Sequence, residues 1–247
     1  MAINVDTVYK TVLLILNQQQ RGYMTPDEFN KVGTQVQLNI FERYADDLNQ
    51  QYRMPQNDTN YANRVKNIED NLQFFQRTAS IPYNAVANNF PLLDFTIPEA
   101  PVVIGTNNTL YRLGSVIFNG TELTQYSQRS EVTQLLLSPL TKPTNDFPVY
   151  LYEQDLLYLY PTTIQTGVTI SYLKKPADIK WTYNVGAFGQ FVYDANGAGA
   201  QDFELNVSEQ TNVITRILAY AGVIINDPTI IQVASQEIAQ DEQNSKM

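Results

Sequence analysis

The sequence predicts an α+β protein: a helical bundle built from both ends of the chain, with an antiparallel β module inserted between them. Apolar residues recur at helical spacing before residue 80 and again after residue 203. Between these ends, frequent prolines exclude long helices, and short runs rich in Val, Ile, Tyr and Phe favour strands. We therefore assign residues 1–80 and 203–247 to the helical bundle and residues 81–202 to the inserted module.

The first helix is expected to begin at Asn4 or Asp6, since either side chain can cap it, and to run to about Gln20. Its apolar stripe consists of Val8, Val12, Ile15 and Leu16. Gly22 stands where a helix commonly ends. Because only a short turn separates this helix from the next one, we expect the two to be antiparallel neighbours.

The second helix, over residues 25–52, is the longest in the chain. Thr25 suits the N-cap, Pro26 suits the first helical position, and Glu28 completes a capping box. Two apolar stripes follow, one of Phe29, Val32, Val36 and Ile40, the other of Leu38, Phe41, Ala45, Leu48 and Tyr52. A helix with two stripes has packing partners on two sides, so we expect it to be the centre of the bundle.

A third helix is expected from Asp58 or Thr59 to about Arg77. Its apolar residues alternate spacings of four and three, which is typical of a helix packed on one face. They are Tyr61, Val65, Ile68, Leu72 and Phe75.

Helical spacing returns near the C-terminus. Asn206 and Glu209 resemble a capping box at the start of a helix over residues 207–226. Its broad apolar face includes Val213, Ile217, Leu218 and Ala221. Asp227 and Pro228 then begin a last helix with Ile230, Ile231, Ala234 and Ile238. Because such stripes cannot all be buried within one helical pair, we expect a core shared by Ile15, Phe41, Leu72 and Leu218.

The first half of the inserted module is expected to contain strands at 90–97, 102–104 and 111–118. The pair Asn119 and Gly120 is typical of a type I′ hairpin turn between two strands. The pattern at 130–137 fits either a short helix or a strand.

The second half of the module is expected to contain a three-stranded meander that ends at Lys174 and Lys175. Its strands are Val149–Glu153, Leu156–Tyr160 and Val168–Leu173. Residues 178–202 show no regular pattern and are expected to be irregular. Within them, the loop Asn196–Gln201 is small and polar, as is the tail Asp241–Met247. We expect both to be mobile in a free subunit and at least one of them to be ordered against a neighbouring subunit.

The composition excludes several classes of function. The chain has 247 residues, no His and no Cys, which removes Ser-His-Asp triads, Cys nucleophiles and the usual zinc and iron–sulfur sites. No glycine-rich phosphate-binding motif is present. Carboxylate-based catalysis and oxygen-ligand metal sites remain possible on composition alone. Since no motif for them stands out, we expect no cofactor, no metal and no enzymatic activity. The net charge of −9 disfavours tight binding of nucleic acid.

The sequence also shows no signal peptide and no apolar run long enough to span a membrane. We expect a soluble protein that is made in the cytoplasm. Three carboxylates on the second helix, Glu42, Asp46 and Asp47, are interpreted as a solvated face rather than a divalent-cation site.

A set of tyrosines on the predicted meander is the main candidate for a binding surface. Tyr150, Tyr152, Tyr158, Tyr160 and Tyr172 lie at alternate strand positions, which would bring several of them onto one face. Such a face suits contact with another subunit or stacking on sugars, although packing within its own domain is the simpler interpretation. Lys174 and Lys175 are candidates for contact with an acidic partner or nucleic acid, or for protection of a sheet edge.

Two stretches resemble known proteins. The opening NVDTVYKTVLLILNQQQRGYMTPDEFNKVGTQVQLNIFERY resembles the start of virion structural proteins of tailed phages, including crAss-like and marine phages. PVYLYEQDLLYLYP with VTISYLKKP is similar to the β module of head-to-tail connector proteins, also called adaptor or ring proteins. The resemblance implies a helical bundle with an inserted β module and a ring, typically dodecameric, below the portal, through which DNA passes. It carries no catalytic residue over to this chain.

The predicted function is therefore that of a non-enzymatic connector subunit in the neck of a virion. Its expected partners are further copies of itself, the portal protein, tail or other neck proteins, and DNA that transits without specific binding. One alternative is a carbohydrate- or receptor-binding virion protein that uses the tyrosine face. A hydrolase that relies on carboxylates alone is a third, for which no tuned pair of acids is visible.

Overall fold

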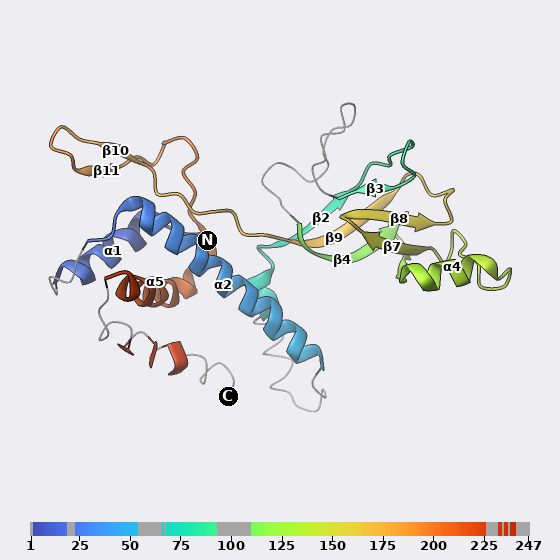
Figure 1. Cartoon of the computed structure of the whole chain (residues 1–247), viewed down its shortest axis with the longest axis horizontal. Coiled ribbons are helices and arrows are strands. Elements are labelled where there is room, and N and C mark those ends of the chain that lie inside the picture. The colour runs from blue at the N-terminus through green and yellow to red at the C-terminus, as the bar shows by residue number, and fades with distance from the viewer. Residues whose placement is uncertain are drawn as a thin grey trace. The chain divides into compact units, whose positions relative to one another are not determined.

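The protein is α+β, as predicted, and its contacts divide it into two compact units. The computed structural model describes residues 2–18, 23–53, 66, 68–92, 110–225, 232–233, 235–236 and 238–240. The helical unit comprises Met1–Phe74 and Pro176–Met247, and the β unit comprises Phe75–Lys175. Figure 1 shows the helices and sheets of each unit.

The helical unit joins the two ends of the chain. Helix α5 (Gln210–Ile225), which follows the short 3-10 helix η1 (Val207–Glu209), packs against both α1 (Val5–Gln18) and α2 (Pro26–Arg53). Strand β1 (Ala2–Ile3) pairs antiparallel with β12 (Phe203–Asn206). A hairpin of β10 (Tyr183–Val185) and β11 (Phe191–Tyr193) also belongs to this unit (Figure 1). Among the described residues, no helix is both long and apolar enough to cross a membrane.

Three of the predicted helix starts are confirmed, and those at Asp58 or Thr59 and at Asp227 lie outside the described residues. The Asn4 side chain accepts a hydrogen bond from the backbone N–H of Thr7 at 3.0 Å. At the start of α2, the backbone N–H of Thr25 donates to the Glu28 carboxylate at 2.9 Å, and the Glu28 N–H donates to the Thr25 hydroxyl at 3.4 Å. This reciprocal pair is the predicted capping box. Asn206 caps η1 by accepting from the N–H of Ser208 at 3.3 Å.

The predicted apolar stripes are largely buried. Both stripes of α2 contribute, and α5 buries residues four apart on one face. The fully buried members are Val8, Val12, Leu16, Phe29, Val36, Ile40, Phe41, Val213, Ile217 and Ala221. The side chains of Leu48 and Tyr52, the turn at Gly22 and most of the predicted last helix lie outside the described residues.

The β unit consists of two four-stranded sheets. One has the order β2 (Gln76–Ser80), β9 (Val168–Lys174), β4 (Leu110–Phe118), β5 (Glu122–Leu123). The other has the order β3 (Phe90–Pro91), β8 (Leu156–Tyr160), β7 (Val149–Glu153), β6 (Gln125–Tyr126). Strands of both sheets contribute to one core, in which Phe90, Val116, Leu157, Val168 and Ile170 are fully buried. Helix α4 (Arg129–Leu137) packs on β7 (Figure 1).

Several local predictions for this unit are confirmed. The strands at 149–153 and 156–160 have the predicted bounds. Asn119 and Gly120 have φ of 55° and 78°, as a type I′ turn requires, and connect β4 to β5. Residues 130–137, for which the sequence allowed either a helix or a strand, belong to a helix, α4.

The predicted third helix ends earlier than expected. Residues 68–72 are helical, but the prediction of helix to Arg77 is wrong, because Gln76–Ser80 forms strand β2 along β9. Most side chains of β2 are exposed, so this segment has no apolar stripe to hold it in a helix. Most of the earlier part of the predicted helix lies outside the described residues.

The prediction of a three-stranded meander is also wrong. Strand β9 lies in the other sheet, between β2 and β4, whereas β8 pairs with β7 and β3. The second edge of β8 is occupied by β3, through Phe90 opposite Leu157. The inward residues of β9 therefore face the core from the opposite sheet.

The boundaries of the inserted module differ from the prediction of 81–202. Residues 75–80 belong to the β unit, and residues 176–202 belong to the helical unit. This second segment is not irregular, because it forms the β10–β11 hairpin and a bridge between Lys180 and Gln201. The loop Asn196–Gln201 makes backbone hydrogen bonds at Gly197, Ala200 and Gln201, and its predicted mobility remains a prediction.

Candidate functional site

The segment that follows the β unit is attached to α2 by three polar side chains. Asn30 pairs with Trp181 twice, accepting from its N–H at 2.7 Å and donating to its carbonyl at 3.3 Å. The Thr34 hydroxyl accepts from the N–H of Ile179 at 3.2 Å, and the Gln37 amide donates to the Ala177 carbonyl at 2.7 Å. Positions 30, 34 and 37 share one face of a helix. Their side chains therefore form hydrogen bonds with the backbone of this extended segment, as the backbone of a neighbouring strand would in a sheet.

A glycine on the same helix allows the segment to approach closely. A Cβ at Gly33 would lie 2.4 Å from Cδ1 of Ile179 and 3.3 Å from the ring of Phe203. Both of those side chains are buried. The small residue therefore lets strand β12 and the 177–181 segment pack directly on α2.

The segment ends in an aromatic cluster around Trp181, the only tryptophan of the chain. Trp181 is 3% exposed and lies 4.5 Å from the ring of Tyr9, 5.7 Å from Tyr183 and 5.6 Å from Tyr193. Its indole N–H donates to the Asp6 carboxylate at 3.1 Å. Burial raises the pKa of the Tyr9 hydroxyl well above its usual range, and this hydroxyl donates to the Met24 carbonyl at 3.0 Å. The cluster fixes the base of the β10–β11 hairpin against α1.

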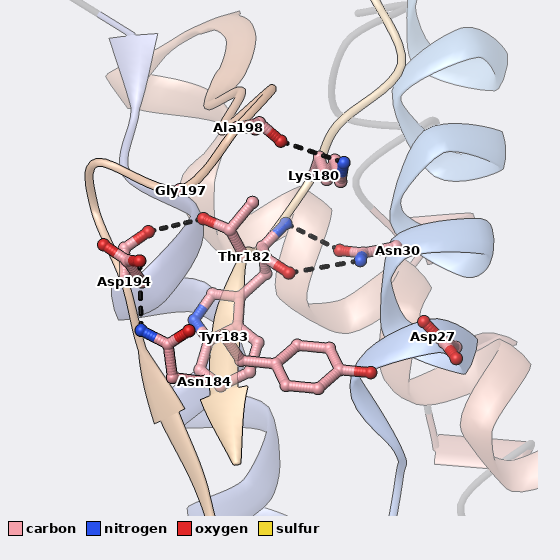
Figure 2. A pocket seen from close by; sticks show the side chains of 10 residues that line it. Asp27, Asn30, Lys180, Thr182, Tyr183, Asn184, Asp194, Gly197 and Ala198 are labelled. Carbon is pink, nitrogen blue, oxygen red and sulfur yellow. Dashed lines mark hydrogen bonds between the residues drawn. The ribbon is translucent and has the colours of Figure 1, made fainter.

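Beside this cluster lies a pocket of about 390 Å³. It is built from the first turn of α2, the segment 180–184 and the loop 194–198 (Figure 2). Its lining is Asp27, Asn30, Lys180, Trp181, Thr182, Tyr183, Asn184, Asp194, Gly197 and Ala198. The pocket is therefore mainly polar, with the Tyr183 ring as an aromatic wall.

Four polar side chains of this pocket donate hydrogen bonds within the protein. Lys180 donates to the Ala198 carbonyl at 3.0 Å, Thr182 donates to the Asp194 carbonyl, and Asn184 donates to the Asp194 carboxylate at 3.1 Å (Figure 2). The amide of Asn30 is committed to the backbone of Trp181. The Asp27 carboxylate has no hydrogen bond or ion pair within the described part of the chain. Asp27 is thus the carboxylate of the pocket that keeps its acceptor oxygens unused by the described residues.

The tyrosines predicted to share one face lie on two. Tyr150 and Tyr152 of β7 are opposite Leu159 and Leu157, and all four face the core between the sheets. Tyr158 and Tyr160 pack on the other side of the sheet, with Val132 of α4. Tyr172 is buried in the core from strand β9. The register of β7 against β8 therefore divides the predicted tyrosine platform.

The two tyrosines of β7 are tied into the protein. Burial raises the pKa of Tyr150. Burial, with a hydrogen bond of 2.6 Å from its hydroxyl to the Asp155 carboxylate, raises the pKa of Tyr152 to about 12. Both residues thus serve the core of the β unit, which was the simpler interpretation of the sequence.

The two lysines after this region differ in environment. Lys174 is 6% exposed and lies on β9, which is a central strand, so its interpretation as protection of a sheet edge is wrong. Lys175 follows the strand and is exposed. Only Lys175 is available for contact with a partner through its whole side chain.

The three carboxylates of α2 that the sequence singled out lie on the outer part of the helix. Glu42 and Asp46 are exposed and Asp47 is half-buried. Across the described ranges, no group of three potential metal-ligating side chains is present.

Sequence patterns missed a set of exposed apolar side chains. In the β unit they are Leu137, Leu140 and Phe147, which we call the α4 surface. In the helical unit they are Val185 and Phe191, which are paired on one face of the β10–β11 hairpin, and Phe188 in the turn between the strands, which we call the hairpin surface. Leu140 and Phe188 are each 94% exposed. The stretch GAFG at residues 186–189 was the available signal for the second surface, since its glycines place an aromatic residue at the tip of a turn.

No protein-family model and no curated protein sequence matches this chain. Its function therefore has to be inferred from the residues, the geometry described above and the resemblance of its two motifs.

Proposed function

We propose that this chain is a non-enzymatic virion structural protein, a head-to-tail connector subunit that forms a ring between portal and tail. The resemblance of residues 4–44 and of the stretches at 148–161 and 168–176 supports this assignment. An α+β protein whose two chain ends meet in one helical unit is compatible with it.

The observation that carries the proposal is the exposure of large apolar side chains in the described part of each unit, at the α4 surface and at the hairpin surface. Isolated apolar residues are normal on protein surfaces, but side chains that are almost wholly exposed, as Leu140 and Phe188 are, favour coverage by another protein. The tip of the hairpin is also well organised. The N–H of Phe188 donates to the Gln190 side chain at 3.1 Å, and Gly186 pairs with Gln190 at 2.8 Å. The tip therefore presents Phe188 on a hydrogen-bonded turn.

Two different surfaces on one chain suit a ring. A head-to-tail contact joins one surface of a subunit to a different surface of the next, and such contacts close into a ring when the rotation between subunits permits. We assign the α4 surface and the hairpin surface to contacts with neighbouring copies or with the portal and tail proteins. DNA would pass through the ring without specific contacts.

Carbohydrate binding by a tyrosine face is the weaker alternative. The five tyrosines that suggested it are divided between the two sides of one sheet and the core of the unit. A glycan array separates the two proposals, since a connector should give no hits.

The test is the mass of the assembly, measured by native mass spectrometry and negative-stain imaging, for the protein alone and mixed with the portal protein of the same virus. We expect rings for the unchanged chain. Leu140→Ser and Phe188→Ser should reduce ring formation. Val86→Ser should not, because Val86, although 95% exposed, is an isolated apolar side chain in the turn that follows Asn84. A chain that stays monomeric alone and with the portal overturns the proposal.

A further inference from the structure

We propose that the pocket between α2 and the 180–198 segment binds an arginine side chain presented by a partner protein. This inference depends on the helical unit alone and not on the connector assignment. It follows from three properties of the pocket: the free carboxylate of Asp27, the charge of the lining, and the aromatic wall.

The first property is a free carboxylate. Asn30, Thr182 and Asn184 each donate a hydrogen bond to a group of the protein itself. The Asp27 carboxylate, with no partner in the described part of the chain, keeps all of its acceptor sites, and the side-chain oxygen of Asn184 is likewise an acceptor. A ligand rich in N–H groups would satisfy these atoms, whereas a ligand rich in oxygen would not.

The second property is charge. Two carboxylates and one ammonium group line the pocket, and the ammonium group of Lys180 is held by the Ala198 carbonyl at 3.0 Å. The surrounding helical unit carries 18 acidic and 10 basic residues. This balance attracts a cation and repels phosphate groups, which disfavours nucleotides and nucleic acid. Charge complementarity therefore indicates a basic partner.

The third property selects arginine among cations. Figure 2 shows the phenol ring of Tyr183 extending across the pocket in the direction of Asp27. A planar guanidinium group can stack on an aromatic ring and donate two parallel hydrogen bonds to one carboxylate, which an ammonium group cannot do. A bare metal ion is disfavoured, since the described residues offer no group of three ligands. The exposed positions of Asp27, Asn184 and Ala198 leave the pocket open to a side chain from another protein.

The experiment uses the full chain and the peptide acetyl-Gly-Arg-Gly-amide, with acetyl-Gly-Lys-Gly-amide as the comparison. Trp181 is the only tryptophan and lines the pocket, so its fluorescence reports binding, and NMR shifts of residues 180–198 locate it. We expect saturable binding of the arginine peptide and at least about fivefold weaker binding of the lysine peptide.

The decisive variant is Asp27→Asn. It should weaken arginine binding by about tenfold, because a charge-assisted hydrogen bond becomes a neutral one. Asp27 is exposed and makes no contact that the fold needs, so the variant should fold normally. Asp46→Asn removes the same charge from the same helix outside the pocket and should leave binding unchanged.

Four outcomes would overturn the proposal. They are no saturable binding of the arginine peptide, equal binding of the lysine peptide, equal weakening by Asp27→Asn and Asp46→Asn, and binding of Mg²⁺ or Ca²⁺ alone that competes with the peptide. The last outcome would indicate a cation site instead.

Discussion

Gln37 shows how much of this fold depends on one buried polar side chain. It is 1% exposed, donates to the Ala177 carbonyl at 2.7 Å and accepts from the N–H of Glu204 at 2.8 Å. The Glu204 carboxylate in turn accepts from the N–H of Ala177 at 3.0 Å. One side chain of α2 therefore holds both the segment that leaves the β unit and strand β12.

We expect Gln37→Leu to lower the free energy of unfolding by about 3 kcal/mol, because two buried backbone groups lose their partner. Gln35→Leu, at an exposed position of the same helix, should change it by less than about 0.5 kcal/mol. Urea denaturation followed by circular dichroism measures both. Equal stabilities of the two variants would show that the buried hydrogen bonds contribute nothing specific.

Tyr152 predicts how stability depends on alkaline pH. Its pKa is raised to about 12 in the folded protein, whereas an ordinary tyrosine has the value 10.0. The folded state therefore favours the neutral phenol. The resulting stabilisation is complete below pH 10 and is lost as the pH rises towards 12.

We expect the free energy of unfolding of Tyr152→Phe to fall less steeply than that of the unchanged chain as the pH rises from 10 to 12. Phenylalanine ionises in neither state, so this contribution to the slope disappears. At neutral pH the variant should lose about 1 kcal/mol with the hydrogen bond to Asp155. Urea unfolding at a series of pH values tests this, and parallel curves would contradict it.

At the scale of elements, the capping box determines where α2 begins. We expect Thr25→Ala to destabilise the protein by about 1 kcal/mol, because the N–H of Glu28 loses its acceptor. The hydrogen bonds from Thr25 also lower the pKa of Glu28. A lowered acid pKa contributes stability at neutral pH that is lost as the pH falls, so the cost of the variant should shrink in acid. Thermal unfolding at pH 7 and in acid measures this difference, and a cost that does not change with pH would contradict the assignment.

Elements that depend on neighbouring residues could be predicted from the sequence. The caps at Asn4 and Thr25 and the turn at Asn119 and Gly120 are set by local hydrogen bonds and backbone preference, and all were predicted. The bounds of β7 and β8 follow from the same kind of local alternation.

Features set by distant contacts could not be predicted. The residues of β9 do not indicate that β2 and β4 flank it. Alternation of apolar and polar residues identifies a strand but not the strands that pair with it. The polar side chains of Asn30, Thr34 and Gln37 have helical spacing, but they look like an ordinary solvated face until the 177–181 segment is placed on them. The pocket combines Asp27 with residues more than 150 positions later, so no motif marks it.

At the scale of the whole molecule, the charge is unevenly distributed. The helical unit has 18 acidic and 10 basic residues, whereas the β unit has 7 and 6. Coulomb repulsion of DNA by such a protein is appreciable within a Debye length of about 8 Å at physiological salt. Phosphate-binding clusters of Lys and Arg would slow DNA that moves through a ring.

We therefore expect no measurable binding of linear duplex DNA at physiological salt, as subunit or as ring. Fluorescence anisotropy of a labelled duplex, repeated over a range of salt concentrations, measures this directly. Micromolar binding that weakens steeply with salt would show that the folded protein gathers its basic residues on one face.

The β unit begins and ends at the same place in the chain's fold. The N–H of Lys174 donates to the carbonyl of Phe75 at 2.9 Å, so a segment of about one hundred residues starts and finishes at hydrogen-bonded neighbours. Because the helical unit is interrupted at a single point, its own backbone does not have to change when the inserted β unit changes in length or shape. During evolution, the β unit could thus be replaced as a block while the helices stayed as they were. The same junction is where an engineer would exchange the β unit for another domain.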